Sequence, residues 1–202
     1  MGKLDIKKKE KQDSLLASAY KLFTRNGFNK TSISDISSEA GVAKGTFYLY
    51  FKDKYDIRNK LVCHKSSKIF LEAAKELEKY KDTVNFEDKI LFLVDYIVNY
   101  LNNDKYMLTF ISKNLSWGIF KTALTDPLTN DDLNFENVYK HLIDSSGYKF
   151  KDSQIMLFLI VELVSSTCYS VILHEEPIGL DEFKPYLIEA VRSIIETNKI
   201  KD

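Results

Sequence analysis

Glycine, proline and cysteine are scarce in this chain of 202 residues, which contains 7 Gly, 3 Pro and 2 Cys. An all-β protein of this length would need many more turn residues, so their scarcity favours helices. The two cysteines, Cys63 and Cys168, are too few and too far apart for a disulfide framework or a cysteine-ligated metal cluster. We expect them to be buried or half-buried thiols in a reducing cytosol.

Long hydrophobic runs are also missing. The longest uninterrupted run, from Ile155 to Val161, ends at Glu162 and falls short of the roughly 18 residues of a membrane span. The N-terminal residues MGKLDIKKKEK carry charges with no apolar stretch behind them, so we expect no signal peptide. Because 45% of the residues are hydrophobic and 29% are charged, global disorder is excluded. These features predict a cytoplasmic protein with no membrane partner.

The charges are unevenly distributed although the net charge is zero. Residues 1–60 contain 13 Lys and Arg against 7 Asp and Glu, whereas residues 61–202 contain 16 against 22. The first segment therefore has a net charge of +6 and the second a net charge of −6. This asymmetry predicts that only the N-terminal part binds a polyanion.

Apolar residues recur at helical spacing along most of the chain, which predicts an all-α fold. We expect a first helix around Leu15 to Phe23 that ends at Gly27, a two-turn helix that Ser32 and Asp35 open as a capping box, and a short helical segment from Val42 to Phe51. Six longer helices are expected over residues 54–80, 86–101, 105–121, 135–145, 155–173 and 182–197.

Residues 31–57 predict a DNA-binding motif. Two short helices joined by a tight turn at Gly41, with Ile36 and Phe47 holding them together, let the second helix project from a rigid support into the major groove. Its outward face carries Lys44 and Tyr48, which can contact phosphates and base edges.

The same residues resemble the DNA-binding domain of the TetR family of bacterial transcriptional regulators. The resemblance covers about 55 residues and is carried by these motifs: Leu22-Phe23-x-x-x-Gly27-Phe28, Thr31-Ser32, Asp35-Ile36, Ala40-Gly41-Val42 and Lys44-Gly45-Thr46-Phe47-Tyr48-x-Tyr50-Phe51-x-x-Lys54. It implies a homodimeric repressor that binds a near-palindromic operator. Residues 1–58 would form a three-helix helix-turn-helix domain, and residues 59–202 would form a bundle of about six helices for effector binding and dimerisation.

The resemblance also implies roles for individual residues. Phosphate contacts are expected from Ser32, Tyr48 and Lys54. Base-edge or mixed contacts are expected from Ser34, Ala43, Lys44, Gly45, Thr46 and Tyr50. Two of these depart from the family pattern. Ser34 replaces a frequent Arg and so removes a potential bidentate reader of guanine. Ala43 replaces a frequent Ser and so removes a helix cap worth roughly 1 kcal/mol.

The C-terminal part is less specific. In this family, aromatic and polar residues on two of its helices often line an effector pocket, which would here consist of Tyr106, Phe110, Trp117, Phe158, Glu162, Ser165 and Tyr169. Aromatic residues at this spacing more often belong to an ordinary core. The helices 155–173 and 182–197 carry more apolar surface than one small bundle can cover, so we expect them to form a dimer interface that includes Ile155, Leu159, Val191 and Ile195.

Three functions are compatible with these patterns. The first is a dimeric repressor that a small, largely apolar effector releases from its operator. The second is a dimeric DNA-binding regulator with no small-molecule effector, controlled by a protein partner or by abundance. The third is an all-α enzyme. The third has no catalytic residues to support it, and the three scattered histidines indicate no metal site, so neither enzyme activity nor a cofactor is expected.

Overall fold

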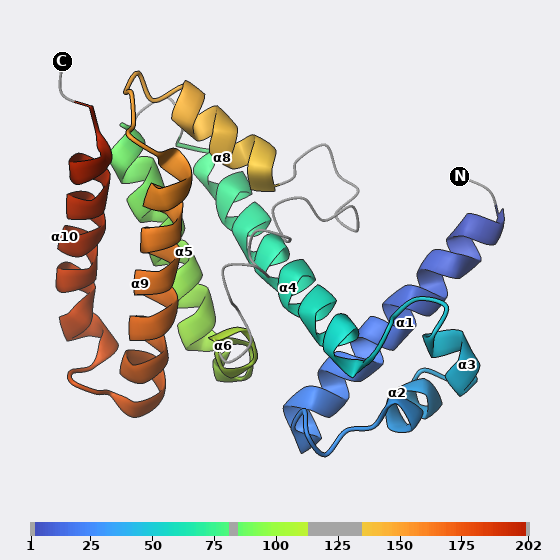
Figure 1. The fold of residues 1–202 in the computed structure, drawn as a ribbon. Helices are drawn as coiled ribbons and strands as arrows, with labels where there is room; N and C mark the ends of the chain where they lie inside the picture. Colours follow the sequence, from blue (N-terminus) through green and yellow to red (C-terminus); the bar gives the residue numbers. More distant parts are fainter. Residues whose placement is uncertain (1–2, 81–84, 113–134, 201–202) are drawn as a thin grey trace. The chain divides into compact units, whose positions relative to one another are not determined.

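The computed structural model describes residues 3–80, 85–112 and 135–200, whose regular secondary structure is helical apart from an isolated pairing of Phe150 with Lys199 (Figure 1). The expected all-α fold is therefore confirmed. The chain divides into two compact units, an N-terminal unit of residues 1–63 and a C-terminal unit of residues 64–202.

The N-terminal unit is built on three helices and the start of a fourth: α1 (Lys3–Asn26), α2 (Ile33–Glu39), α3 (Lys44–Phe47) and α4 (Lys54–Leu77). Its core is apolar and fully buried around Leu15, Ile36 and Phe47. Helix α1 is far longer than the expected helix around Leu15 to Phe23. The polar residues before Leu15 are mainly Lys, with Glu and Gln, which are good helix formers and so extend the helix by several turns.

Two glycines end helices as predicted. Gly27 follows α1 with φ +85° and donates its N–H to the Phe23 carbonyl at 3.1 Å. Gly41 has φ +67° in the turn between α2 and α3. Both lie in the left-handed region that favours glycine, so each turn depends on the residue type that the sequence provides.

The C-terminal unit contains the rest of α4 and five more described helices: α5 (Phe86–Asn103), α6 (Lys105–Ser112), α8 (Phe135–Asp144), α9 (Ser153–His174) and α10 (Leu180–Asn198). Helix α9 packs against α5, α6 and α10, and Figure 1 shows α9 and α10 side by side with a short connection. Ion pairs fasten α10 to α5: Lys184 Nζ lies 2.9 Å from Asp95 Oδ1, and Arg192 lies 2.8 Å from Asp88 Oδ1. These contacts fix the faces that α9 and α10 turn inward.

The structure corrects part of the expected dimer interface. Val191 and Ile195 are both 0% exposed because they face the core of their own bundle, so they are not on an outer stripe. Ile155 and Leu159, by contrast, are 53% and 41% exposed on α9. An apolar stripe remains uncovered, but it lies on α9.

Helix α9 also qualifies the expectation about membrane spans. By length and composition it could cross a membrane, with a mean hydropathy of 2.0, although Glu162 interrupts its apolar run. A third of this apolar window is buried inside the protein. The core helix of a soluble protein has the same composition, so this helix is weak evidence for membrane insertion.

Candidate functional site

Helices α2 and α3 form a compact pair whose outward surface is the candidate DNA-binding site. Ile36 and Phe47 are 0% exposed, and the Phe47 ring packs 5.5 Å from that of Phe51. The Val42 N–H donates to the Ser37 carbonyl at 2.9 Å, which closes the turn. Helix α3 is only four residues long, so its direction is set by the buried Phe47 anchor.

Four residues of α3 and the turn after it are exposed together: Lys44, Gly45, Tyr48 and Leu49. Thr46 and Tyr50 are half-buried beside them. Tyr48 is 53% exposed with its ring edge against Phe47 at 5.5 Å, and Leu49 is 77% exposed. The structure thus brings the expected contact residues of this helix onto one surface and adds Leu49. Leu49 was not among the expected contacts because the family motif has no fixed residue at this position, although an apolar side chain between Tyr48 and Tyr50 is a visible signal.

Ser32 forms the predicted capping box with Asp35. Its Oγ accepts from the Asp35 N–H at 3.1 Å and donates to Asp35 Oδ2 at 2.7 Å, and its own N–H donates to the same carboxylate at 2.8 Å. The backbone and hydroxyl of Ser32 hold the pKa of Asp35 below its usual value. Ser34 is exposed on α2, and Ala43 begins α3 without a side-chain cap, as its replacement of Ser implied.

Lys54 is held by the chain itself. Its Nζ donates to the carbonyls of Phe28 and Thr31 at 2.8 and 2.9 Å and lies 4.4 Å from the centre of the Phe28 ring. An ammonium group has three donors, so one of them stays available for a phosphate. Lys54 therefore braces the loop before α2 in addition to its expected role.

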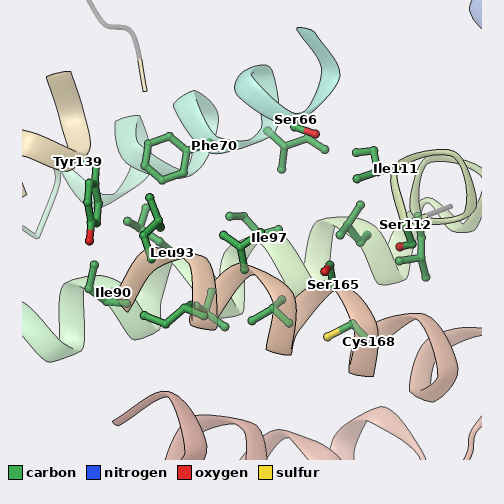
Figure 2. Close-up of a pocket in the computed structure, with 18 of the residues that line it drawn as sticks. Ser66, Phe70, Ile90, Leu93, Ile97, Ile111, Ser112, Tyr139, Ser165 and Cys168 are labelled. Carbon is green, nitrogen blue, oxygen red and sulfur yellow. The ribbon is translucent and has the colours of Figure 1, made fainter. Parts of the chain in front are cut away.

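The C-terminal unit contains a cavity of about 140 Å³. Its wall comes from α4, α5, α6, α8 and α9 and is almost entirely apolar, as Figure 2 shows. Helices α5 and α9 contribute most of the apolar wall, and α4 contributes Ile69 and Phe70. The expected effector pocket included no residue of α4 or α5, although the α5 residues Ile90, Leu93, Val94, Ile97 and Leu101 follow the spacing of one continuous helix face.

Among the predicted effector residues in the described segments, Ser165 lines this cavity and five others do not. Tyr106 is 74% exposed, and Glu162 is exposed on α9. Both face away because the inner sides of α6 and α9 are taken by apolar residues. The remaining three are Phe110, Phe158 and Tyr169. Trp117 lies outside the described residues.

The polar groups on the cavity wall are uncharged. The Tyr139 hydroxyl donates to the Ser153 carbonyl at 2.6 Å, and burial raises its pKa. Burial raises the pKa of the Cys168 thiol to about 11. Both groups are therefore protonated at neutral pH, and the described wall contains no Asp, Glu, Lys, Arg or His. Nor do the described residues form a cluster of three His, Cys, Asp or Glu that could hold a metal ion.

Comparison with known families agrees with the helix-turn-helix geometry. Residues 15–61 match the family model described as bacterial regulatory proteins, tetR family. The matched residues contain all of α2 and α3, the candidate DNA-binding surface.

Individual proteins extend the similarity to the whole chain. The fatty acid metabolism regulator protein of Bacillus subtilis is 33% identical over 97 residues, which are 48% of this chain and about half, 48%, of that relative. A helix-turn-helix-type transcriptional regulator of Staphylococcus aureus is 23% identical over 94% of this chain and 97% of its own length. The crystal structure of Thermus thermophilus FadR with lauroyl-CoA is similar with a TM-score of 0.61 and 16% identity, over 95% of this chain and 96% of that one. At this identity the structural likeness shows the shared fold.

Proposed function

The chain belongs to the TetR family of bacterial transcriptional regulators, and we propose that it is a repressor that binds a near-palindromic operator as a homodimer. We further propose that a small, largely apolar effector releases it from that operator. The observation that carries this proposal is the surface of α3, where Lys44, Tyr48 and Leu49 are exposed above the buried Phe47.

The DNA contacts are assigned by exposure. Lys44, Gly45 and Thr46 at the start of α3 are proposed to meet base edges in the major groove, with Ser34, Ala43 and Tyr50 beside them. Tyr48, Ser32 and the third donor of Lys54 are proposed to contact phosphates, which position a protein without reading sequence. The Asp35 carboxylate occupies Ser32, so a phosphate would have to share the Ser32 hydroxyl with it.

The uncovered stripe on α9 supports a homodimer. Ile155 and Leu159 are exposed on a helix with few charged residues, and a second copy of α9 and α10 would bury them in a four-helix bundle. In a two-fold dimer the recognition helices should lie about one DNA turn apart, on the order of 34–36 Å. A symmetric dimer therefore needs an operator with inverted symmetry.

The cavity supports an effector. The known ligand of the Thermus relative, lauroyl-CoA, has a long apolar chain, and the cavity wall of this protein is apolar. Helix α4 carries Lys54 near the DNA-binding surface and Ser66, Ile69 and Phe70 at the cavity. We propose that the effector acts through this helix. Favouring the DNA-free arrangement by about 1–3 kcal/mol would change operator affinity by a factor of roughly 5–150.

Selection of bound duplexes from random DNA tests the first part of this proposal. The selected sites should show inverted symmetry and bind two copies of the chain, with the mass of the complex measured by sedimentation. Sites without inverted symmetry, or a chain that binds them as a monomer, would contradict it. Screening for compounds that both raise the melting temperature and release the selected DNA then separates the effector hypothesis from control by a protein partner or by abundance.

A further inference from the structure

The polar atoms of the cavity are not spread evenly over its wall. Figure 2 shows Tyr139 and Ile90 at one end, and Ile111 and Ser112 at the other, with Ser66, Ser165 and Cys168 toward that second end. The Tyr139 hydroxyl is already bonded to the Ser153 carbonyl. Ser165 Oγ donates to the Glu162 carbonyl at 3.4 Å and keeps its capacity to accept a hydrogen bond. The hydrogen-bonding groups other than Tyr139 therefore lie toward the second end of an otherwise apolar cavity.

Ser66 stands out among these groups. Its Oγ is buried and has no hydrogen-bond partner among the described residues. A serine inside a helix often donates to the carbonyl four residues earlier, and Ser66 does not. Burying a hydroxyl without a partner is unfavourable, so a ligand group bonded to Ser66 Oγ would remove an existing penalty.

The cavity also limits the charge and size of its ligand. No described wall residue could neutralise an ion, and burying an unpaired charge is strongly unfavourable. The volume of about 140 Å³ is close to that of an engineered apolar cavity of about 150 Å³ that binds benzene. A single ring or a short chain matches this volume.

We propose that this cavity binds a small neutral amphiphile, of about six to eight carbon atoms with one hydroxyl or carbonyl group, and that Ser66 Oγ holds that polar group. The inference deepens the proposed function, because it names the chemical class of the effector. The apolar part of the ligand lies among the α5 side chains, and its polar group lies toward Ser66 and Ser165.

Three compounds with one ring skeleton test this proposal: benzyl alcohol, toluene and benzoate. Calorimetric titration of the full chain at neutral pH should show benzyl alcohol binding about tenfold more tightly than benzoate, because benzoate must bury its charge. Ser66→Ala should lower the affinity for benzyl alcohol about fivefold and leave the affinity for toluene unchanged, since toluene makes no hydrogen bond. Ser193→Ala, exposed on α10, is the matched control and should change neither affinity.

The melting temperature of the unliganded variant separates a binding role for Ser66 from a structural one. Ser66→Ala should melt at the same temperature as the unsubstituted chain or higher, because it removes an unsatisfied buried hydroxyl. A lower melting temperature, or an unchanged preference for benzyl alcohol over toluene, would assign Ser66 to the fold and overturn its role.

Lauroyl-CoA distinguishes failure of this inference from failure of the proposed function. If lauroyl-CoA releases operator DNA and benzyl alcohol does not bind, the effector hypothesis stands and the small neutral ligand is wrong. If benzyl alcohol binds through Ser66 without affecting DNA affinity, the cavity assignment stands and its regulatory role is wrong. Benzoate binding as tightly as benzyl alcohol would overturn the neutral ligand directly.

Discussion

The candidate functional residues of the N-terminal unit are exposed, whereas those of the C-terminal unit line an internal cavity. In residues 1–63, the buried Phe47 supports exposed Lys44 and Tyr48. In residues 64–202, the candidate ligand site is an internal cavity with an uncharged wall. A DNA surface must present charge and hydrogen bonds to a polyanion, while a site for a neutral, largely apolar effector excludes charge and needs only a few hydrogen-bonding groups. The two units therefore respond differently to the same kind of substitution.

The largest effect is expected where a charge replaces a buried residue of the C-terminal unit. Val191→Lys places an ammonium group at a position with 0% exposure and should destabilise this unit by more than about 4 kcal/mol. Thermal unfolding followed by circular dichroism measures the loss. Leu159→Lys, on the exposed stripe of α9, is the matched control: it should keep its melting transition and instead sediment as a monomer with weakened operator affinity. Equal destabilisation by the two variants would show that α9 has no free face.

Removing the anchor of the recognition helix should have the next largest effect. Phe47→Ala empties a fully buried site and should cost about 3–5 kcal/mol in the N-terminal unit. DNA binding should be lost while the variant still binds the cavity probe benzyl alcohol, because the cavity belongs to residues 64–202. Tyr48→Phe, which keeps the ring contact, should fold normally. If Phe47→Ala also abolished binding of benzyl alcohol, the C-terminal unit would not keep its fold when the N-terminal unit is destabilised.

A smaller effect separates two lysines of the N-terminal unit. Lys54→Ala removes two hydrogen bonds to carbonyls and should lower stability by about 1–3 kcal/mol. If its third donor contacts a phosphate, the log–log salt slope of DNA binding should also fall by about one. Lys44→Ala should leave the melting temperature unchanged and alter base preference, because Lys44 is exposed. Substitution of the exposed Lys52 by Ala is the control. An unchanged salt slope in Lys54→Ala would show that Lys54 only stabilises the loop before α2.

The smallest effect concerns alkaline pH. The folded pKa of Cys168 is about 11 against an unfolded value of 9.0, so the unfolded chain loses this proton first. Stability from Cys168 is therefore complete below pH 9 and lost as the pH rises toward 11, by roughly 2 kcal/mol. Denaturant titrations at both pH values should show a smaller decline for Cys168→Ala than for the unsubstituted chain. An equal decline in Cys168→Ala and the unsubstituted chain would show that other groups cause the loss of stability.

The N-terminal unit could be predicted from sequence because its signals are local. Ser32 and Asp35 lie three residues apart in a capping box, and Gly27 and Gly41 occupy turns that need positive φ. The bracing role of Lys54 could not be predicted in this way. Its partners Phe28 and Thr31 lie more than 20 residues away, so only the folded chain brings them together.

The C-terminal unit was harder to predict because its signals are ambiguous. Helix α9 is apolar on almost every side, so its sequence does not indicate which face is inward. Helix α10 has a clear stripe that includes Leu187, Val191 and Ile195, but a single apolar stripe belongs first to the core of its own bundle. The predicted dimer interface was therefore wrong at Val191 and Ile195, which lie on the inner face of α10. The cavity likewise depends on residues from five helices, and no single helix reveals it.

The hold on Lys54 also determines how this amine reacts with chemical reagents. Acylation requires a free amine, and the Lys54 ammonium group is half-buried with two of its three protons donated to carbonyls. Lys44 and Lys52 are exposed nearby. When lysine acylation is followed by mass spectrometry, we therefore expect Lys54 to react more slowly than Lys44 and Lys52. Rapid labelling of Lys54 would show that its hydrogen bonds to the carbonyls of Phe28 and Thr31 have broken. The reactivity of this one amine therefore reports whether the loop before α2 is folded.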